Sequence, residues 1–215
     1  MDSYKFAPDI ETASRDNLKI IHLEKLQRIL VHAFKNVPHY DQSFREAGVS
    51  PADLNSLDDL AKFPFTVKDD LRNNYPFDMF AVAQKDIIRI HASSGTTGKP
   101  TVVGYTKEDL NLWGDLMART LACLGARPGD IVHNAYGYGL FTGGLGAHQG
   151  AERLGCSVVP VSGGQTERQI VLLKDFGARV LCATPSYALN IAEVADREGI
   201  DLKNGPLAVG AFGAE

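Results

Sequence analysis

The sequence lacks several features that mark specialised classes of protein. It has no run of about 18 apolar residues, so we expect no membrane-spanning segment. Its net charge is −4 and it has no block of lysine and arginine, so the attraction that supports non-specific nucleic-acid binding is missing. The first residues are polar and acidic, which argues against a secretory signal. We therefore expect a cytoplasmic protein that binds neither membranes nor nucleic acids.

Cysteine is also scarce. Cys123, Cys156 and Cys182 lie far apart in apolar segments, without the C-x-x-C spacing of a zinc module. We expect three buried free thiols in a reducing compartment, and the sequence predicts no metal ligand.

Two common catalytic motifs are missing. No G-x-S-x-G is present, which disfavours a serine hydrolase. The loop around Lys99 is not a Walker A loop, because Gly95 and Gly98 are separated by two residues rather than four. Pro100 also stands where a serine or threonine would bind magnesium, which disfavours a kinase-like or GTPase-like protein.

What is present is the balance of an ordinary globular protein, with 44% apolar and 22% charged residues. Residues 1–84 predict a mostly helical region, with one helix over 14–37 that Pro38 stops, and another that begins at Thr66 with Asp69 in a capping box. Residues 85–215 predict helices alternating with strands at 87–92, 101–105, 131–135, 157–161, 179–183 and 207–212.

That alternation predicts an α/β fold, built from parallel βαβ units with helices on both faces of the sheet. We expect two parts, a helical region over 1–84 and an α/β portion over 85–215. The sequence ends in an apolar run followed by GAE, so we expect it to be a portion of a longer protein.

The stretch SSGTTGKPT, residues 93–101, lies between two predicted strands. Its glycines permit positive φ and leave room for a ligand, successive backbone N–H groups can form an anion-binding nest, and Lys99 adds a positive charge. These features predict an oligophosphate site. A solvated hairpin loop is the alternative, although it does not explain four hydroxyls beside a lysine.

A second unusual stretch, residues 134–150, combines Tyr136, Tyr138 and Phe141 with six glycines. Aromatic faces could stack on a planar acyl group while glycines leave space for it. Close helix–strand packing with the aromatics in the core is the alternative. His133 and His148 are predicted to be core or capping residues rather than catalytic bases.

The loop resembles the phosphate-binding loop of the adenylate-forming enzymes, the superfamily of acyl-CoA synthetases. Lysine before Pro100 and threonine after it, with the continuation VVGYT, resembles the phenylacetate–CoA ligase branch. The stretches PFTVKDDLR (64–72), NAYGYGLFTGGLGAHQGAERLG (134–155), ATPSY (183–187) and the final GAE also resemble that branch, in the same order. The resemblance covers nearly the whole chain.

The resemblance implies the roles of particular residues. Lys99 would act in catalysis by neutralising phosphate charge, and Glu215 would lie beside the nucleotide or magnesium. Tyr136, Phe141 and Gly143 would line the aryl pocket. The nucleotide would be bound by Ser93, Ser94, Gly95, Thr96, Thr97, Gly98, Lys99, Thr101, Gly213, Ala214 and Glu215.

The resemblance also implies a reaction, in which ATP with Mg²⁺ and an aryl acid such as phenylacetate give an acyl-adenylate and diphosphate. Coenzyme A then displaces AMP, as the first step of aerobic phenylacetate degradation. A further lysine on a mobile C-terminal domain assists in the family and is outside this sequence, so we expect the 215 residues alone to be inactive. A homodimer is possible. The alternative is a non-catalytic nucleotide-binding or interaction fragment.

Overall fold

The computed structural model describes residues 4–93 and 98–214. Ser94, Gly95, Thr96 and Thr97 of the predicted phosphate loop lie outside the described residues, as does Glu215. The chain forms two compact units, Pro8–Lys107 and Met1–Ala7 with Glu108–Glu215. The division at residue 84, which was drawn from the change in sequence pattern, stays a prediction.

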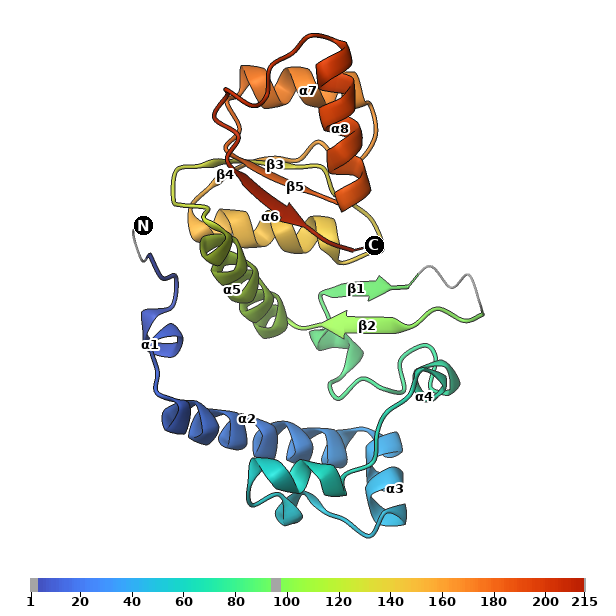
Figure 1. Ribbon diagram of the computed structural model, residues 1–215. Coiled ribbons are helices and arrows are strands. Elements are labelled where there is room, and N and C mark those ends of the chain that lie inside the picture. The colour runs from blue at the N-terminus through green and yellow to red at the C-terminus, as the bar shows by residue number, and fades with distance from the viewer. Residues whose placement is uncertain (1–3, 94–97, 215) are drawn as a thin grey trace. The chain divides into compact units, whose positions relative to one another are not determined.

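The unit Pro8–Lys107 is helical except for one hairpin (Figure 1). Its core consists of Phe44, Leu54 and Phe63, with the rings of Phe44 and Phe63 packed edge to face at 5.2 Å between centroids. Short 3₁₀ helices cover Pro51–Asp53, Leu57–Lys62 and Gln84–Asp86. The other elements are α1 (Pro8–Glu11), α2 (Arg15–Asn36), α3 (Pro38–Glu46), α4 (Lys68–Asn73), β1 (Arg89–Ala92) and β2 (Val102–Tyr105).

The long N-terminal helix is confirmed. The Ser14 hydroxyl accepts the Asn17 amide at 3.2 Å and caps α2, because a helix start leaves its first N–H groups without partners. α2 ends at Asn36, where Val37 takes an extended conformation. Pro38 has a second role, since it is also the first residue of α3, where its missing N–H costs nothing.

The predicted cap of α4 is wrong by one residue. The helix begins at Lys68, and the Asp70 carboxylate accepts the backbone N–H of Val67 at 2.7 Å. The Thr66 hydroxyl instead donates to the phenolic oxygen of Tyr40 at 3.2 Å. A tertiary partner has taken the hydroxyl that the local pattern assigned to the cap.

The second unit is a parallel α/β sheet, as predicted. Its strands lie in the order β4-β3-β5-β6 and all pair in parallel. The elements in chain order are α5 (Lys107–Leu124), β3 (Ile131–Asn134), α6 (Gly143–Leu154), β4 (Ser157–Val159), α7 (Thr166–Asp175), β5 (Val180–Ala183), α8 (Pro185–Arg197) and β6 (Val209–Phe212).

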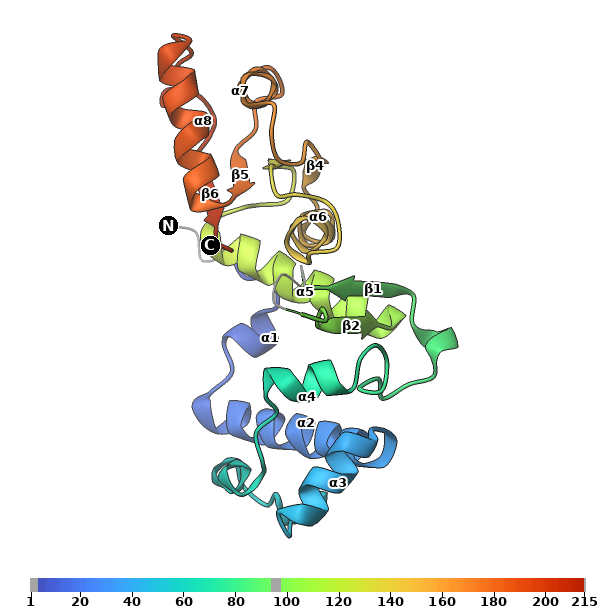
Figure 2. The ribbon, with the colours of Figure 1, turned by 90° about the vertical axis from the view of Figure 1, so that its right-hand side faces the viewer.

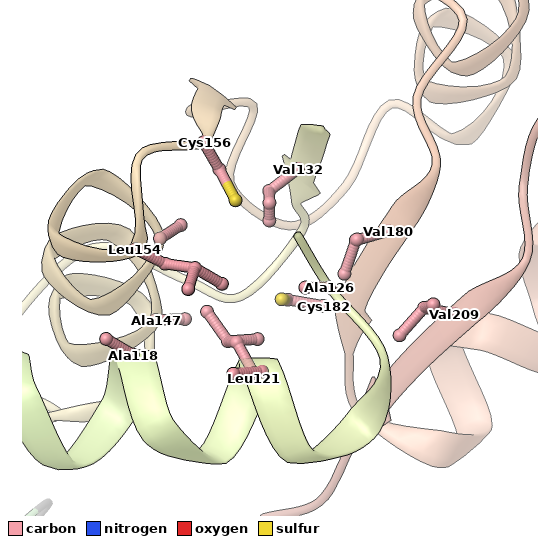
Figure 3. Packing of buried hydrophobic residues seen from close by; sticks show 12 residues of the cluster. Ala118, Leu121, Ala126, Val132, Ala147, Leu154, Cys156, Val180, Cys182 and Val209 are labelled. Atoms are coloured by element: carbon pink, nitrogen blue, oxygen red, sulfur yellow. The ribbon is translucent and has the colours of Figure 1, made fainter. Parts of the chain in front are cut away.

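Helices cover both faces of this sheet. Figure 1 shows α5 and α6 on one face and α7 and α8 on the other, and Figure 2 gives the same layers from the side. Successive side chains of β5 point to opposite faces of the sheet, as they do in any strand. Val180 and Cys182 pack toward α5 and α6, where Leu121 and Leu154 lie beside them (Figure 3). Leu181 and Ala183 pack toward α7 and α8.

The prediction of three buried thiols is wrong for one of them. Cys156 and Cys182 are buried, whereas Cys123 is exposed on α5. Burial raises the pKa of Cys156 to about 11 and that of Cys182 to about 12, so both stay protonated and unreactive at neutral pH. Within 4–93 and 98–214, no helix is both long and apolar enough to cross a bilayer.

The strand order indicates at which edge of the sheet a ligand would bind. The chain leaves β3 toward β4 on one side, then crosses to β5 and continues to β6 on the other. In open α/β sheets, ligands bind outside the carboxyl ends of the strands where the direction reverses, here between β3 and β5. The segments that follow β3 and β6 meet at this edge, and they include the predicted pocket residues.

Candidate functional site

The predicted phosphate loop connects β1 and β2, two antiparallel strands in which Ala92 pairs with Val102. Its two ends are tied together. The Ser93 amide donates to the carbonyl oxygen of Thr101 at 2.9 Å, and the Thr101 amide donates to the Ser93 hydroxyl oxygen at 2.9 Å. Ser93 and Thr101 therefore close the loop and set its width.

Lys99 carries the positive charge of this loop. Its side-chain nitrogen lies 5.6 Å from the centroid of the Tyr75 ring, a cation–π contact worth about 0.5–1 kcal/mol at an exposed site. In the described part of the chain, Lys99 forms no ion pair with a carboxylate. Its charge is therefore not neutralised by a described carboxylate and is available to an anion.

Gly98, next to Lys99, has φ of +136°, a conformation that residues with a side chain rarely adopt. A glycine turn beside a cation, over a loop closed by two hydrogen bonds, suits a phosphate chain. Among the described residues, no three His, Cys, Asp or Glu side chains converge on one point. Magnesium carried by ATP needs no such cluster, because it takes phosphate oxygens and waters with one or two carboxylates.

Tyr136 lies at the sheet edge just after β3. Its hydroxyl donates to the carbonyl oxygen of Ala211 in β6 at 3.1 Å, across the end of β5. Burial raises the pKa of Tyr136, as does nearby Cys182, while a backbone hydrogen bond from Gly213 acts the other way. The phenol is therefore neutral and works as a donor and as an aromatic surface.

The two residues after β6, Gly213 and Ala214, are part of the same edge. A Cβ on Gly213 would lie 4.0 Å from the Tyr136 hydroxyl, and Ala214 has a left-handed φ of +69°. The structure thus brings together Tyr136, Gly213 and Ala214, which the sequence assigned to the acid and nucleotide.

Phe141 and Gly143 complete the predicted pocket residues in this unit. Phe141 is 63% exposed, so its ring is not part of the core of this unit. Gly143 is the first residue of α6, and a Cβ there would be 4.0 Å from the Tyr136 ring, an ordinary contact. The exposed Phe141 ring, two residues before Gly143, is free to contact a planar ligand.

The glycines of this segment fall into two groups. Gly137 and Gly139 face open space, with nothing within 4 Å of an added Cβ. Gly144, Gly146 and Gly150 lie in α6 against other parts of the unit, and a Cβ on each would come within 3.0 Å of a neighbour. Close packing therefore explains the glycines of α6, and the pocket interpretation of the segment stays a prediction.

The sequence did not predict a series of hydrogen bonds that supports the segment 134–150. The Asn134 amide nitrogen donates to the phenolic oxygen of Tyr138 at 2.6 Å and to the carbonyl oxygen of Gly144 at 2.8 Å. The Tyr138 hydroxyl therefore donates onward to Nδ1 of His148 at 3.0 Å, and Nε2 of His148 donates to Glu152 at 3.0 Å. Tyr138 and His148 support the segment from within.

A second missed feature is the buried pair of His133 and Gln169, whose Nε2 and Oε1 lie 2.6 Å apart. Gln169 donates through its amide nitrogen to the carbonyl oxygens of Ser162, at 2.6 Å, and Gly164, at 2.9 Å. Because that nitrogen is the donor, Oε1 accepts and His133 carries its proton on Nε2. Burial lowers the pKa of His133 and the bond to Gln169 opposes this shift.

An apolar groove with a volume of about 540 Å³ lies elsewhere in this unit. It is lined by side chains of β5, α8 and β6, including Pro185, Leu189 and Phe212, and Lys203 is its only charged residue. It contains neither Tyr136 nor Phe141, so we do not assign it to the acid.

Solved structures define the class of protein to which this fold belongs. A 2-hydroxyisobutyryl-CoA ligase solved with 2-HIB-AMP and CoA has a TM-score of 0.91 and 34% identity, over 96% of this chain and 45% of that one. An open conformation of that ligase gives a TM-score of 0.90 and 33% identity, over 97% of this chain and 50% of that one. The fold is that of the adenylate-forming CoA ligases, as the phosphate loop predicted.

Curated relatives narrow the similarity to one kind of ligase. The chain is 59% identical over 206 residues to a phenylacetate-coenzyme A ligase from Pseudomonas putida, 56% over 207 to one from Escherichia coli (strain K12) and 51% over 210 to one from Thermus thermophilus. These matches cover 96–98% of this chain and 47% of each relative, so the chain spans about half the length of the curated relatives it matches. No family model matches the sequence. The predicted resemblance to phenylacetate–CoA ligases is confirmed.

Proposed function

We propose that this chain supplies the ATP- and acid-binding portion of an AMP-forming phenylacetate–CoA ligase. The observation that carries the proposal is the 51–59% identity to phenylacetate-coenzyme A ligases over nearly all of this chain. Two features support it independently. One is the loop that Ser93 and Thr101 close around Lys99, and the other is the pair of aromatic residues Tyr136 and Phe141 after β3.

In the first half-reaction, a carboxylate oxygen of the acid attacks the α-phosphorus of ATP. The bond to the bridging oxygen breaks and diphosphate leaves. Two anions must approach each other in line, so the protein has to position them and offset their charge. Ser93 and Thr101 hold the loop that binds the phosphates, and Lys99 supplies positive charge to them.

The acid lies at the sheet edge in this proposal. Tyr136, Phe141 and Gly143 contact its aromatic ring, and Gly213 and Ala214 contact the nucleotide. Phe141 supports this role, because an apolar ring that is largely exposed in the free protein gains contacts when a ring covers it.

In the second half-reaction, the thiolate of coenzyme A attacks the acyl carbonyl. The carbon–oxygen bond breaks and AMP leaves, giving the thioester. Mg²⁺ bound with ATP would screen the phosphate charge. Because the chain spans about half of its relatives, we propose that these 215 residues alone do not turn over.

We propose that the ligase is cytoplasmic, that it begins the aerobic degradation of phenylacetate and that it forms a homodimer. The buried, protonated thiols of Cys156 and Cys182 agree with a reducing compartment. A non-catalytic nucleotide-binding fragment remains the second candidate, favoured only by the length of this chain relative to its relatives.

The test is exchange of labelled diphosphate into ATP by the full-length ligase that carries this sequence, with and without phenylacetate. Exchange that depends on phenylacetate supports the proposal. Binding of ATP without exchange for any aryl acid would favour the non-catalytic candidate instead.

A further inference from the structure

Two loops meet at the carboxyl edge of the sheet, the aromatic segment 135–142 after β3 and the segment 162–165 after β4. The Ser162 amide donates to the carbonyl oxygen of Asn134 at 3.2 Å. The Tyr138 amide lies 3.4 Å from the Ser162 hydroxyl oxygen, which accepts from it. Ser162 therefore joins the two loops from both of its polar groups.

The segment 162–165 has an unusual backbone. Ser162 and Gln165 have φ of +69° and +51°, although neither is glycine, and Gly164 has φ of +89°. A side chain at such φ angles is disfavoured and persists only where the surroundings hold it. Some contact must therefore hold this segment in place.

Gln169 provides that contact from the first turns of α7. Its side chain is fully buried, and its amide donates to the carbonyl oxygens of Ser162 and Gly164. The Tyr187 hydroxyl also donates to the carbonyl oxygen of Gly164, at 2.8 Å. These hydrogen bonds hold the segment from its buried side, while Gly163 and Gly164 stay exposed.

His133 fixes Gln169 in turn. It is fully buried on β3, and its Nε2–H donates to Oε1 of Gln169. A flipped amide would turn Oε1 toward the carbonyl oxygens of Ser162 and Gly164, two acceptors that it cannot bond. Asn134, the neighbour of His133, leads directly into the aromatic segment. The contacts form a closed path from β3 through α7 and Ser162 back to Tyr138.

We propose that Gln169, oriented by His133, is a positioning residue that sets the aromatic segment 135–142 and so the affinity for the acid. This inference rests on the proposed function of Tyr136 and Phe141. Gln169 does not touch the acid, and it acts through Ser162. Its loss should loosen the acid site and leave the Lys99 loop, which belongs to the other unit, unchanged.

The main variant is Gln169→Met, which keeps the length of the side chain and removes all three hydrogen bonds. The matched control is Ile170→Ala, which removes buried volume at the next residue of α7 and leaves all three hydrogen bonds of Gln169 in place. Steady-state kinetics of the full-length ligase and hydrogen exchange of the Ser162 and Tyr138 amides are measured for both, with the melting temperature.

For Gln169→Met, we expect a rise of about 10- to 100-fold in the phenylacetate KM, an ATP KM within about twofold and faster exchange of both amides. Ile170→Ala should lose melting temperature with both KM values near wild type. Equal effects of the two variants on the phenylacetate KM would overturn the inference, because the effect would then be general loss of stability.

Ser162→Ala serves if Gln169→Met does not fold. It removes the acceptor of the Tyr138 amide at a half-buried position and should raise the phenylacetate KM by about 2- to 10-fold, the loss of one hydrogen bond. An unchanged KM would contradict the inference. A wild-type ligase inactive with every aryl acid would instead contradict the proposed function, and the exchange data would still show whether Gln169 holds segment 162–165.

Discussion

The hydroxyl of Tyr136 lies 3.1 Å from the carbonyl oxygen of Ala211, two residues before Gly213. This hydrogen bond joins the exit of β3 to the end of β6 over β5, so one contact sets the position of the tyrosine ring and of the segment that follows β6. In the proposed acid site, the Tyr136 ring is therefore held in one position, whereas the Phe141 ring is largely exposed.

Truncation of Phe141 tests the acid pocket. Phe141→Ala should raise the phenylacetate KM by one to three decades, because a buried ring with one ring–ring contact is worth roughly 1.5–4 kcal/mol. Bulkier para-substituted acids should lose less, and the ATP KM should stay nearly unchanged. Since Phe141 is 63% exposed, the melting temperature should hardly move.

Leu140→Ala is the control, since Leu140 is adjacent and also 53% exposed. It should leave the phenylacetate KM unchanged. A folded Phe141→Ala variant with a normal phenylacetate KM would remove Phe141 from the pocket.

Lys99→Ala tests the phosphate loop. The loss of one charge-assisted contact should cost about 1.5–3 kcal/mol in ATP use, with little effect on acid binding. Diphosphate exchange at saturating acid measures this loss. Lys85→Ala, an exposed lysine before β1, is the control and should behave like wild type. If both lysine variants match wild type, Lys99 has no role in the site.

The packing glycines make a prediction about stability alone. A Cβ on Gly150 would lie 2.8 Å from the carbonyl carbon of Met117 and 2.9 Å from the amide nitrogen of Ala118. Gly150→Ala should therefore lower the free energy of unfolding by about 1–3 kcal/mol as α6 is pushed from α5. Gly139→Ala, which has open space around it, should stay within about 0.5 kcal/mol of wild type. Chemical denaturation of the two variants would reveal equal stabilities if this packing were unimportant.

The lowered pKa of His133 predicts that the free energy of unfolding depends on pH. Its folded pKa is lowered by burial, below about 6.5 for the unfolded chain. Below pH 6.5 the unfolded state therefore binds more protons, and the free energy of unfolding falls as pH falls, by up to about 1.4 kcal/mol per pH unit. The carboxylates with lowered pKa, Asp53, Asp59 and Asp201, lose their contribution only below about pH 4.

Urea denaturation between pH 7.5 and 5 measures this dependence. His133→Asn should flatten the slope in that window, whatever it does to stability at pH 7.5. A slope that is the same in both proteins would show that another group binds the proton.

The fold was predictable where the pattern is local. Apolar runs identified the six strands found in residues 4–93 and 98–214, and the order of strands and helices predicted the parallel sheet. Strand ends were less certain, because a period of two residues does not say where pairing stops, and β4 ends at Val159 rather than at residue 161. Thr66 was misassigned because its partner, Tyr40, is 26 residues away.

The same limit applies to the candidate site, whose local features were predictable and whose contacts between distant residues were not. The loop composition and the aromatic segment were visible in short stretches of sequence. His133 and Gln169 were not, because they are 36 residues apart and meet only after α7 crosses the sheet. Cys123 is exposed because it follows Leu121 and Ala122, which take the buried face of α5.

The most direct test follows one oxygen atom. In the proposed reaction a carboxylate oxygen of the acid attacks the α-phosphorus and remains on AMP when coenzyme A displaces it. With phenylacetate labelled with ¹⁸O in its carboxylate, ATP and coenzyme A, the full-length ligase should release AMP that carries one ¹⁸O atom. Mass spectrometry detects it. AMP without the label, or ADP in its place, would contradict the account.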